Sequence, residues 1–146
     1  KTYWKNRSNG RKTGTFDFLG FTHYLTKSRR GNVRLGRKTI GKRMRRTLID
    51  LNDRLRRWRS ALPFKELYQR LRRILTGYYN YYGFAGNMDT LNKFDYAVRR
   101  IWFKWLNRRS QRNSFNWEQF QKMLKRYPLP QPRILKTYSW IYAAVL

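Results

Sequence analysis

Carboxylate, imidazole and thiol groups, which carry most acid–base, metal-assisted and nucleophilic catalysis, are few in this sequence and widely spaced. The only histidine is His23, and cysteine is absent, so neither a catalytic triad nor a zinc site can be assembled within one chain. The seven carboxylates are Asp17, Asp50, Asp53, Glu66, Asp89, Asp95 and Glu118. We therefore expect no catalytic residue, no bound metal ion and no cofactor in this chain itself.

Positive charge dominates the composition: 35 lysine and arginine residues stand against 7 acidic ones, a formal net charge of +28 over 146 residues. Such a surplus repels itself unless an anionic partner neutralises it, and a nucleic-acid backbone does so while releasing counterions. A disordered basic tail is excluded, because 40% of the residues are hydrophobic and 18% are aromatic. No apolar run approaches the roughly 20 residues of a membrane-spanning helix. We expect a folded domain that binds nucleic acid and not a membrane.

Residues 16–39 have the pattern of paired strands. FDFLGFTHYLT precedes the turn-prone SRRGN and then VRLGRKT, which predicts a β-hairpin with Gly31 and Asn32 in its loop. The apolar alternation changes phase near Gly20, as a β-bulge would cause. His23 lies among aromatic residues of the first strand, and we interpret it as structural.

A helix with one basic face is predicted from Lys42 onwards. Its apolar residues recur at spacings of three and four and form one narrow stripe. Asp50 and Asp53 lie four residues before Arg54 and Arg57, a spacing at which ion pairs support a helix. Cations on the opposite, exposed face can follow a phosphate backbone. The candidate nucleic-acid-binding residues of this helix are Lys42, Arg43, Arg45, Arg46, Arg56 and Arg57.

Three further helices are predicted. Pro63 separates the first helix from the second, which ends at Gly83. The third covers residues 90–108, and a short fourth helix begins after Asn116, which is placed to cap it together with Gln119. Prolines then hold the following segment extended.

The outer face of the third predicted helix places aromatic residues next to a cation. Tyr96, Arg100 and Phe103 follow one another there at spacings of four and three. An aromatic ring beside a guanidinium can stack on an unpaired base. We therefore add Arg100 to the nucleic-acid-binding candidates. Tyr96 and Phe103 are candidates for base stacking or for contact with another part of the parent protein.

The order of these motifs resembles the C-terminal part of group II intron reverse transcriptase/maturases. It implies that residues 1–40 are the end of the polymerase palm, with a primer-gripping hairpin. Residues 41–146 would be the thumb, or maturase domain X, a helical bundle with a proline-rich C-terminal extension. The expected fold class is thus mainly α, with an N-terminal β-hairpin before the bundle. The resemblance covers about residues 14–138, and it is carried by FDFLGF at 16–21, LTGYYNYYG at 75–83, RRIWFKWLNRRSQ at 99–111 and NWEQFQKMLKRYPLPQPRI at 116–134.

The resemblance also implies a role for each part. The polymerase site of the family, a Tyr-x-Asp-Asp turn that uses Mg²⁺, lies upstream of the block that residues 16–21 match, and this sequence contains no two adjacent aspartates. Family members use the thumb to hold intron RNA in its splicing-competent fold and to close over primer and template. The first thumb helix is implied to run along the duplex. Gly77 and its neighbouring tyrosines match a motif whose expected role is packing.

Three hypotheses follow. The preferred one is an RNA-binding thumb and maturase segment, with intron RNA, RNA/DNA primer–template and the upstream palm and fingers as partners. A second is a fragment or subunit of an active RNA-directed DNA polymerase whose aspartates lie upstream. A third is a general basic nucleic-acid-binding protein. The absence of cysteine agrees with a reducing compartment, and the expected location is the bacterial cytoplasm.

Overall fold

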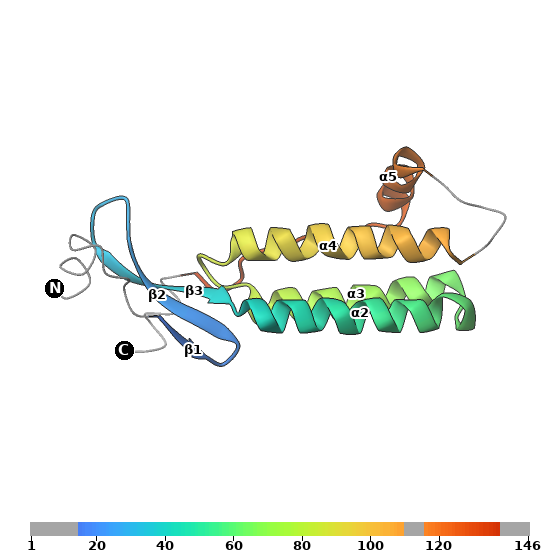
Figure 1. Cartoon of the computed structure of the whole chain (residues 1–146). Helices are drawn as coiled ribbons and strands as arrows, with labels where there is room; N and C mark the ends of the chain where they lie inside the picture. Colours follow the sequence, from blue (N-terminus) through green and yellow to red (C-terminus); the bar gives the residue numbers. More distant parts are fainter. Residues whose placement is uncertain (1–14, 110–115, 138–146) are drawn as a thin grey trace.

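A small antiparallel sheet precedes a helical bundle in the computed structural model, which describes residues 15–109 and 116–137 (Figure 1). The expected fold class, mainly α after an N-terminal β element, is confirmed. No helix in these two stretches is long and apolar enough to cross a membrane. The strands are β1 (Phe16–Phe18), β2 (Phe21–Lys27) and β3 (Val33–Thr39), and the helices are α2 (Gly41–Ala61), α3 (Phe64–Tyr82), α4 (Met88–Asn107) and α5 (Trp117–Arg126).

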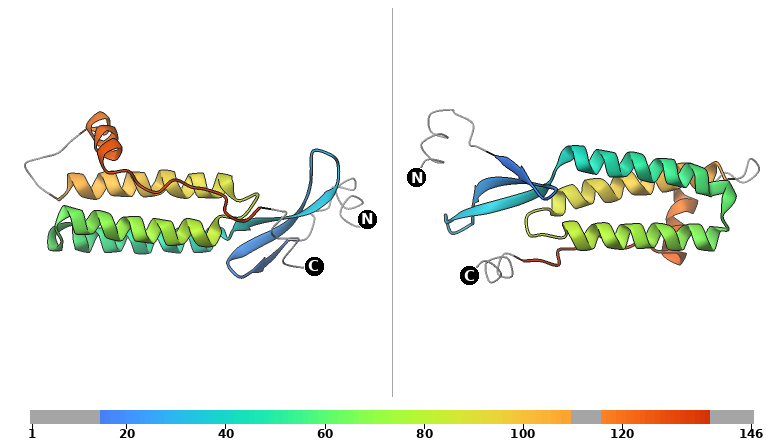
Figure 2. Two further views of the ribbon diagram at one scale, coloured as in Figure 1. Left: turned by 180° about the vertical axis from the view of Figure 1, so that it is seen from behind. Right: turned by 90° about the horizontal axis from the view of Figure 1, so that it is seen from below.

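The three long helices lie side by side, and the sheet extends from one end of the bundle (Figures 1 and 2). α5 lies across α4 near the other end. Residues 128–137, which we call the strap, then run back along the bundle beside α3 toward the sheet. The strap is fixed at both ends, because the Tyr68 hydroxyl donates to the Pro128 carbonyl and the Leu135 amide donates to the Gly83 carbonyl at 2.9 Å. The expected extended segment is thus confirmed as far as residue 137.

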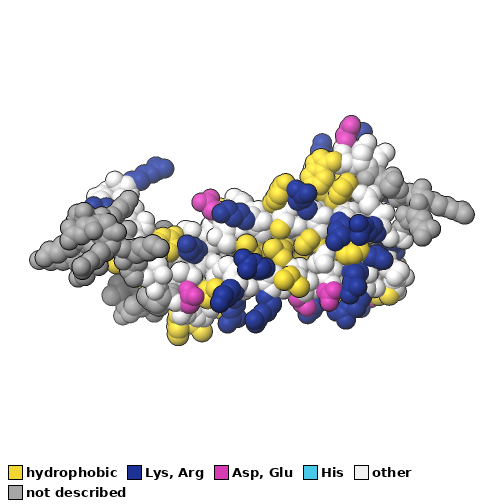
Figure 3. All heavy atoms as spheres, in the orientation of Figure 1, with side chains coloured by type: hydrophobic (Ala, Val, Ile, Leu, Met, Phe, Trp, Pro, Cys, Tyr) yellow, Lys and Arg dark blue, Asp and Glu magenta, His cyan; other side chains and the backbone are white. Residues whose placement is uncertain are grey.

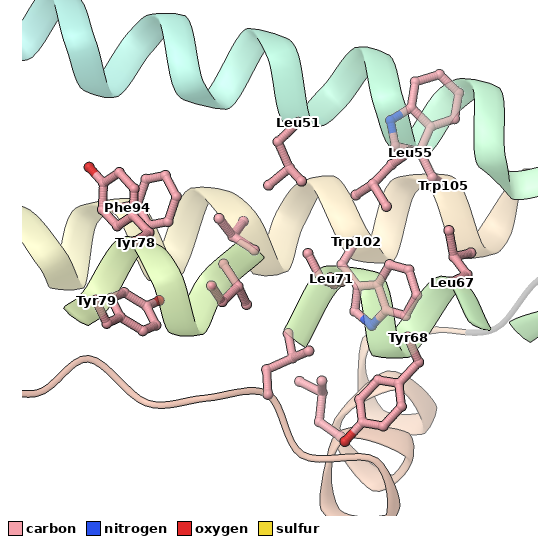
Figure 4. Close-up of a cluster of buried hydrophobic side chains, with 14 of the residues drawn as sticks. Leu51, Leu55, Leu67, Tyr68, Leu71, Tyr78, Tyr79, Phe94, Trp102 and Trp105 are labelled. Carbon is pink, nitrogen blue, oxygen red and sulfur yellow. The ribbon is translucent and has the colours of Figure 1, made fainter. Parts of the chain in front are cut away.

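The core lies where the apolar stripes of the three long helices meet (Figure 4). Each stripe follows the three- and four-residue spacing that the sequence predicts. Its central members, such as Leu51 and Leu55 of α2, are buried, while others, such as Met44, Leu48 and Trp58, are partly buried against them.

Tyr78 of α3 stacks on Phe94 of α4, with 3.7 Å between the ring centroids. Trp102 of α4 is fully buried between α3 and α5 neighbours, and it stacks on Phe64 at 6.1 Å. Burial of these large rings holds the bundle together.

The predicted bulge near Gly20 is wrong, because the chain turns back at this point. Leu19 and Gly20 have φ values of 51° and 85°, so both central residues of a two-residue turn adopt positive φ, as a type I′ turn requires. β1 therefore pairs antiparallel with β2, with Phe18 opposite Phe21. The structure thus contains a three-stranded sheet where the sequence predicts a two-stranded hairpin. The loop predicted at Gly31 is confirmed, since Gly31 has φ of 83° between β2 and β3.

Two contacts attach the sheet to the bundle. Phe21 is buried against Tyr82 and Phe84, with ring centroids 5.2 Å and 4.9 Å away. Asn87, which is completely buried, accepts from the Thr39 amide at 2.9 Å and donates to the Thr39 hydroxyl and the Tyr82 carbonyl. His23 is also buried in β2, in agreement with a structural role. The sheet is therefore held to the ends of α3 and α4.

The short helix α5 begins as the sequence predicts. The Asn116 side chain accepts from the Gln119 amide at 2.9 Å, and the Gln119 side chain accepts from the Asn116 amide at 3.0 Å, a complete capping box. This cap fixes the start of the helix, and Phe120 and Leu124 on its apolar side are buried. The capping box therefore sets which α5 side chains reach α4.

Buried tyrosines should make the fold sensitive to alkaline pH. Burial raises the pKa of the Tyr78 and Tyr79 phenols above the usual value, and Asp95, which accepts from Tyr79 at 3.0 Å, raises that of Tyr79 further. These phenols ionise more readily in the unfolded chain, so their contribution is complete below about pH 10 and is lost as pH rises above it. Between pH 9 and 10.5 the two together should cost about 1.5 to 2 kcal/mol of unfolding free energy.

Chemical denaturation at both pH values would measure this loss. The matched control is Tyr79→Phe, which removes one ionisable group and should make the alkaline decrease smaller. An unfolding free energy that stays constant to pH 10.5 would contradict the burial of these phenols.

Candidate nucleic-acid interface

The cations of α2 form its exposed face. All six candidate residues on this helix are exposed, and so is Arg100 of α4. The apolar stripe turns Leu51 and Leu55 into the core, and at 100° per residue this leaves the cations on the outer side. The 21-residue helix carries eight lysines and arginines against two aspartates. The placement that the sequence predicts for these side chains is therefore confirmed, while nucleic-acid binding by them stays a prediction.

Ion pairing separates the α2 cations into two groups. Asp50 pairs with Arg54 at 2.9 Å as expected, but Asp53 pairs with Arg56 at 3.1 Å and not with Arg57. A helical carboxylate can pair with a cation either three or four residues later. Spacing alone therefore does not determine whether Asp53 pairs with Arg56 or with Arg57. The remaining candidates make no ion pair with any carboxylate in the described residues. This set, which we call the α2 ridge, consists of Lys42, Arg43, Arg45, Arg46 and Arg57.

A groove beside the ridge combines cations with aromatic rings. It has a volume of about 670 Å³ and lies between α4, α5 and Asn52 of α2. Figure 3 shows hydrophobic side chains next to Lys and Arg side chains on this side of the molecule. No acidic residue lines it. We call it the α4 groove, and its lining residues are Asn52, Tyr96, Arg100, Ile101, Phe103, Lys104, Asn107, Arg108 and Trp117.

Tyr96 is the open aromatic side chain of the α4 groove, with 60% of its surface exposed. Arg100 donates to the Tyr96 hydroxyl at 3.1 Å, and its guanidinium lies 5.7 Å from the centre of the Tyr96 ring. This contact orients both side chains before any ligand arrives. The sequence-based pairing of Tyr96 with Arg100 is thus present in the structure.

Phe103 is covered more than the sequence indicates. It is half-buried, and its ring packs edge-on against Trp117 at 5.3 Å and Phe120 at 5.1 Å, both from α5 of the same chain. The expected open Tyr96/Phe103 face is therefore wrong in its second member, because α5 folds over it. Trp117 takes the exposed position instead, with 45% of its surface accessible. The spacing of Trp117 three residues before Phe120 is the signal that could have placed it there.

Positive charge accumulates at the far end of the groove. The buried ring of Trp105 has Arg59 at 4.7 Å, Lys104 at 4.4 Å and Arg108 at 5.5 Å from its centre. Trp105 also donates to the Asn52 side chain at 2.9 Å, which joins α4 to α2. Cation–π attraction to the ring holds these three side chains in place. Their positive charges remain, because the ring has no net charge to neutralise them. The groove is thus suited to an anion that carries a planar group.

The carboxylates of the described helices lie apart from one another. No group of three or more histidine, cysteine, aspartate or glutamate side chains that could hold a metal ion occurs there. The carboxylates of α2, α3 and α5 make ion pairs along their own helices, as Arg70 with Glu66 at 3.0 Å illustrates. Asp95 is engaged by both Arg99 and Tyr79. The arrangement can bind anions and rings.

Comparison with known protein families assigns residues 42–127 to the group II intron, maturase-specific domain. The chain belongs to this family. The match includes α2, α3, α4 and α5 of the maturase-specific domain, and therefore both the α2 ridge and the α4 groove. No curated protein and no solved structure matches the chain significantly.

Proposed function

We propose that this chain is the RNA-binding thumb segment of a group II intron reverse transcriptase. It binds structured intron RNA, assists splicing and grips a primer–template. The observation that carries the proposal is the α2 ridge: five exposed cations with no carboxylate partner in the described residues, on one helix of a maturase-specific domain. Cations arranged along a helix match the repeating charge of a phosphate backbone.

The α4 groove adds a site for a base. By angular position on α2, Arg45 of the ridge lies within about 20° of Asn52, which lines the groove, so the ridge and the groove share an edge. A strand whose phosphates follow α2 can place an unpaired base on Tyr96, where Arg100 is already positioned. This is the interaction by which proteins read single-stranded parts of structured RNA.

The sheet supports the upstream palm as a protein partner. Leu25 and Leu35 are paired across β2 and β3, and Val33 lies on the same face. Their side chains remain 36%, 40% and 50% exposed. The bundle covers the other end of this face, where Phe21 is buried, so the apolar surface continues outward from a packed interface. The proposed occupant is the palm of the parent protein.

Replacing two ridge residues tests the RNA part of the proposal. Arg46→Ala with Arg57→Ala should weaken binding to a structured group II intron transcript about tenfold, because two phosphate contacts are lost. The melting temperature should not fall, since both side chains are exposed and make no ion pair in the described residues. Fluorescence anisotropy and thermal denaturation measure the two effects.

The matched control removes the same charge elsewhere. Lys122 and Lys125 are exposed on α5, outside the ridge and the groove. Their double replacement by alanine should leave affinity within about twofold of the unmodified chain. If both double variants bind equally weakly, binding depends on net charge alone and the α2 ridge is not the interface. Competition with tRNA separates recognition of intron RNA from general basic binding.

A further inference from the structure

The outward face of α3 contains a glycine that no contact among the described residues explains. Gly77 lies inside the 19-residue helix, is exposed, and has no positive φ. A side chain added there would meet no atom of residues 15–109 or 116–137 within 4 Å. Glycine inside a helix destabilises it relative to alanine, because its backbone is more flexible in the unfolded chain. The expected packing role is therefore wrong for Gly77, although Tyr78 and Tyr82 of the same motif are buried.

Gly83 provides the contrast within the same motif. A Cβ atom at Gly83 would lie 2.5 Å from the Tyr79 carbonyl oxygen and 2.7 Å from the Arg133 carbonyl oxygen. The strap can pack here only because residue 83 has no side chain. Gly83 is thus explained by a contact inside the molecule, whereas the space in front of Gly77 is open to an outside partner.

The residues around Gly77 are hydrogen-bond donors. They form a stripe at spacings of three and four along α3, and each is exposed. Glu66, the one acidic residue of α3, is paired with Arg70 at 3.0 Å. Beside the stripe, Arg72 and Arg133 line a groove of about 290 Å³ between α3 and the strap. We call the stripe the α3 surface, and it consists of Lys65, Gln69, Arg73, Thr76, Gly77 and Asn80.

We propose that the α3 surface is a second RNA-binding site, where a sugar-phosphate backbone lies directly on the helix at Gly77. This inference rests on the proposed function, since it takes RNA as the ligand. Cations, amides and a hydroxyl around a position without a side chain suit close approach of phosphate and ribose groups. A protein partner would need apolar anchors. Tyr81, four residues after Gly77, is the one exposed large hydrophobic residue of α3, and its ring and hydroxyl already contact Phe21 and Leu19 of the sheet.

The two RNA-binding surfaces lie on different flanks of the bundle. Figure 2, in the view from below, shows α2 along one edge and α3 along the other, with the strap beside α3. One straight duplex on the α2 ridge does not reach the outer side of α3. The domain therefore contacts two RNA segments and fixes their separation, which is the physical requirement for holding a folded RNA in one arrangement.

Substitution of Gly77 separates stability from binding. Gly77→Ala and Gly77→Leu should both raise the melting temperature, by about 3 °C for alanine, because a better helix former enters open space. The same changes should weaken binding to a group II intron transcript, about threefold for alanine and about tenfold for leucine, as the side chain pushes the backbone away. If Gly77 had only a structural role, its replacement would not both raise the melting temperature and weaken RNA binding.

Asn92→Ala is the matched control. Asn92 is exposed on α4 and lines neither groove, so alanine there should stabilise the helix without changing affinity. Hydroxyl-radical footprinting of the same transcript assigns the surfaces: Gly77→Leu should lose protection at one RNA segment, and Arg46→Ala with Arg57→Ala at another.

Three results would overturn the inference. If Gly77→Leu binds as tightly as the unmodified chain while the ridge variant binds weakly, the second site is absent and the proposed function stands. If the unmodified chain does not bind the transcript, both proposals fail together. A melting temperature that falls in the Gly77 variants would also contradict the inference, because it would show that the space is not open.

Discussion

Binding of structured RNA to this domain should weaken by about three to five orders of magnitude when monovalent salt rises from about 50 to about 200 mM. The reason is counterion release: each cation that neutralises a phosphate returns one condensed ion to solution. The α2 ridge supplies five such cations, and Lys65, Arg73 and Arg133 add three near the α3 surface. Six to ten contacts would give a log–log slope of about −5 to −9.

The measurement is a series of anisotropy titrations in KCl, with Mg²⁺ held at a level that keeps the transcript folded. Arg46→Ala with Arg57→Ala should reduce the magnitude of the slope by about two, one for each lost phosphate contact. The α5 control, Lys122→Ala with Lys125→Ala, should leave the slope unchanged. A response that is nearly flat would mean that the ridge does not lie on phosphates.

The helices of the bundle were predictable because their sequence pattern and their packing agree. Leu67, Leu71 and Leu75 recur every four residues, and one face of α3 is buried as a result. The capping box at Asn116 is equally local, since its bonds connect residues three apart. A helix or a cap that depends only on residues close together in the sequence can be predicted without knowing the tertiary structure.

The β1–β2 turn could not be recognised from composition. Two-residue turns of this type usually contain Asn-Gly or Asp-Gly, whereas here Leu19 adopts positive φ. Tertiary contacts support it: the Tyr81 hydroxyl donates to the Leu19 carbonyl at 2.9 Å, from 62 residues away. Because the turn at Leu19 depends on a distant residue of α3, the sequence around Leu19 does not indicate it.

The candidate site was predicted in part for the same reason. The α2 cations are dense in the sequence and lie on one face, so counting and helical geometry found them. Phe103 was placed on the correct helix, but whether it is open depends on where α5 packs. The α3 surface was missed because its cations alternate with core residues, and the strap that borders it comes from more than 50 residues later.

Asn87→Ala should remove about 2 to 6 kcal/mol of unfolding free energy, because two buried polar groups lose their partner, and it should loosen the sheet first. The substitution leaves the buried Thr39 amide and Thr39 hydroxyl without the partner that Asn87 provides, whereas the Tyr82 carbonyl keeps the Phe84 amide, which donates to it at 2.8 Å. Each buried polar group left unpaired costs about 1 to 3 kcal/mol. The loss is a large part of the roughly 5 to 15 kcal/mol that stabilises a typical domain.

Hydrogen exchange can show where the loss occurs. Amides of β2 and β3 should exchange faster in Asn87→Ala, while those of α3 and α4 keep more of their protection, because the leucine and tryptophan core does not involve Asn87. Asn92→Ala, which replaces an exposed asparagine of the helix that follows Asn87, should leave exchange in the sheet unchanged. Uniformly faster exchange in sheet and bundle would show that they unfold as one unit. The sheet would then unfold together with the bundle. In that case one hydrophobic core would hold both the α2 ridge and the apolar face of the sheet that we propose for the palm in position.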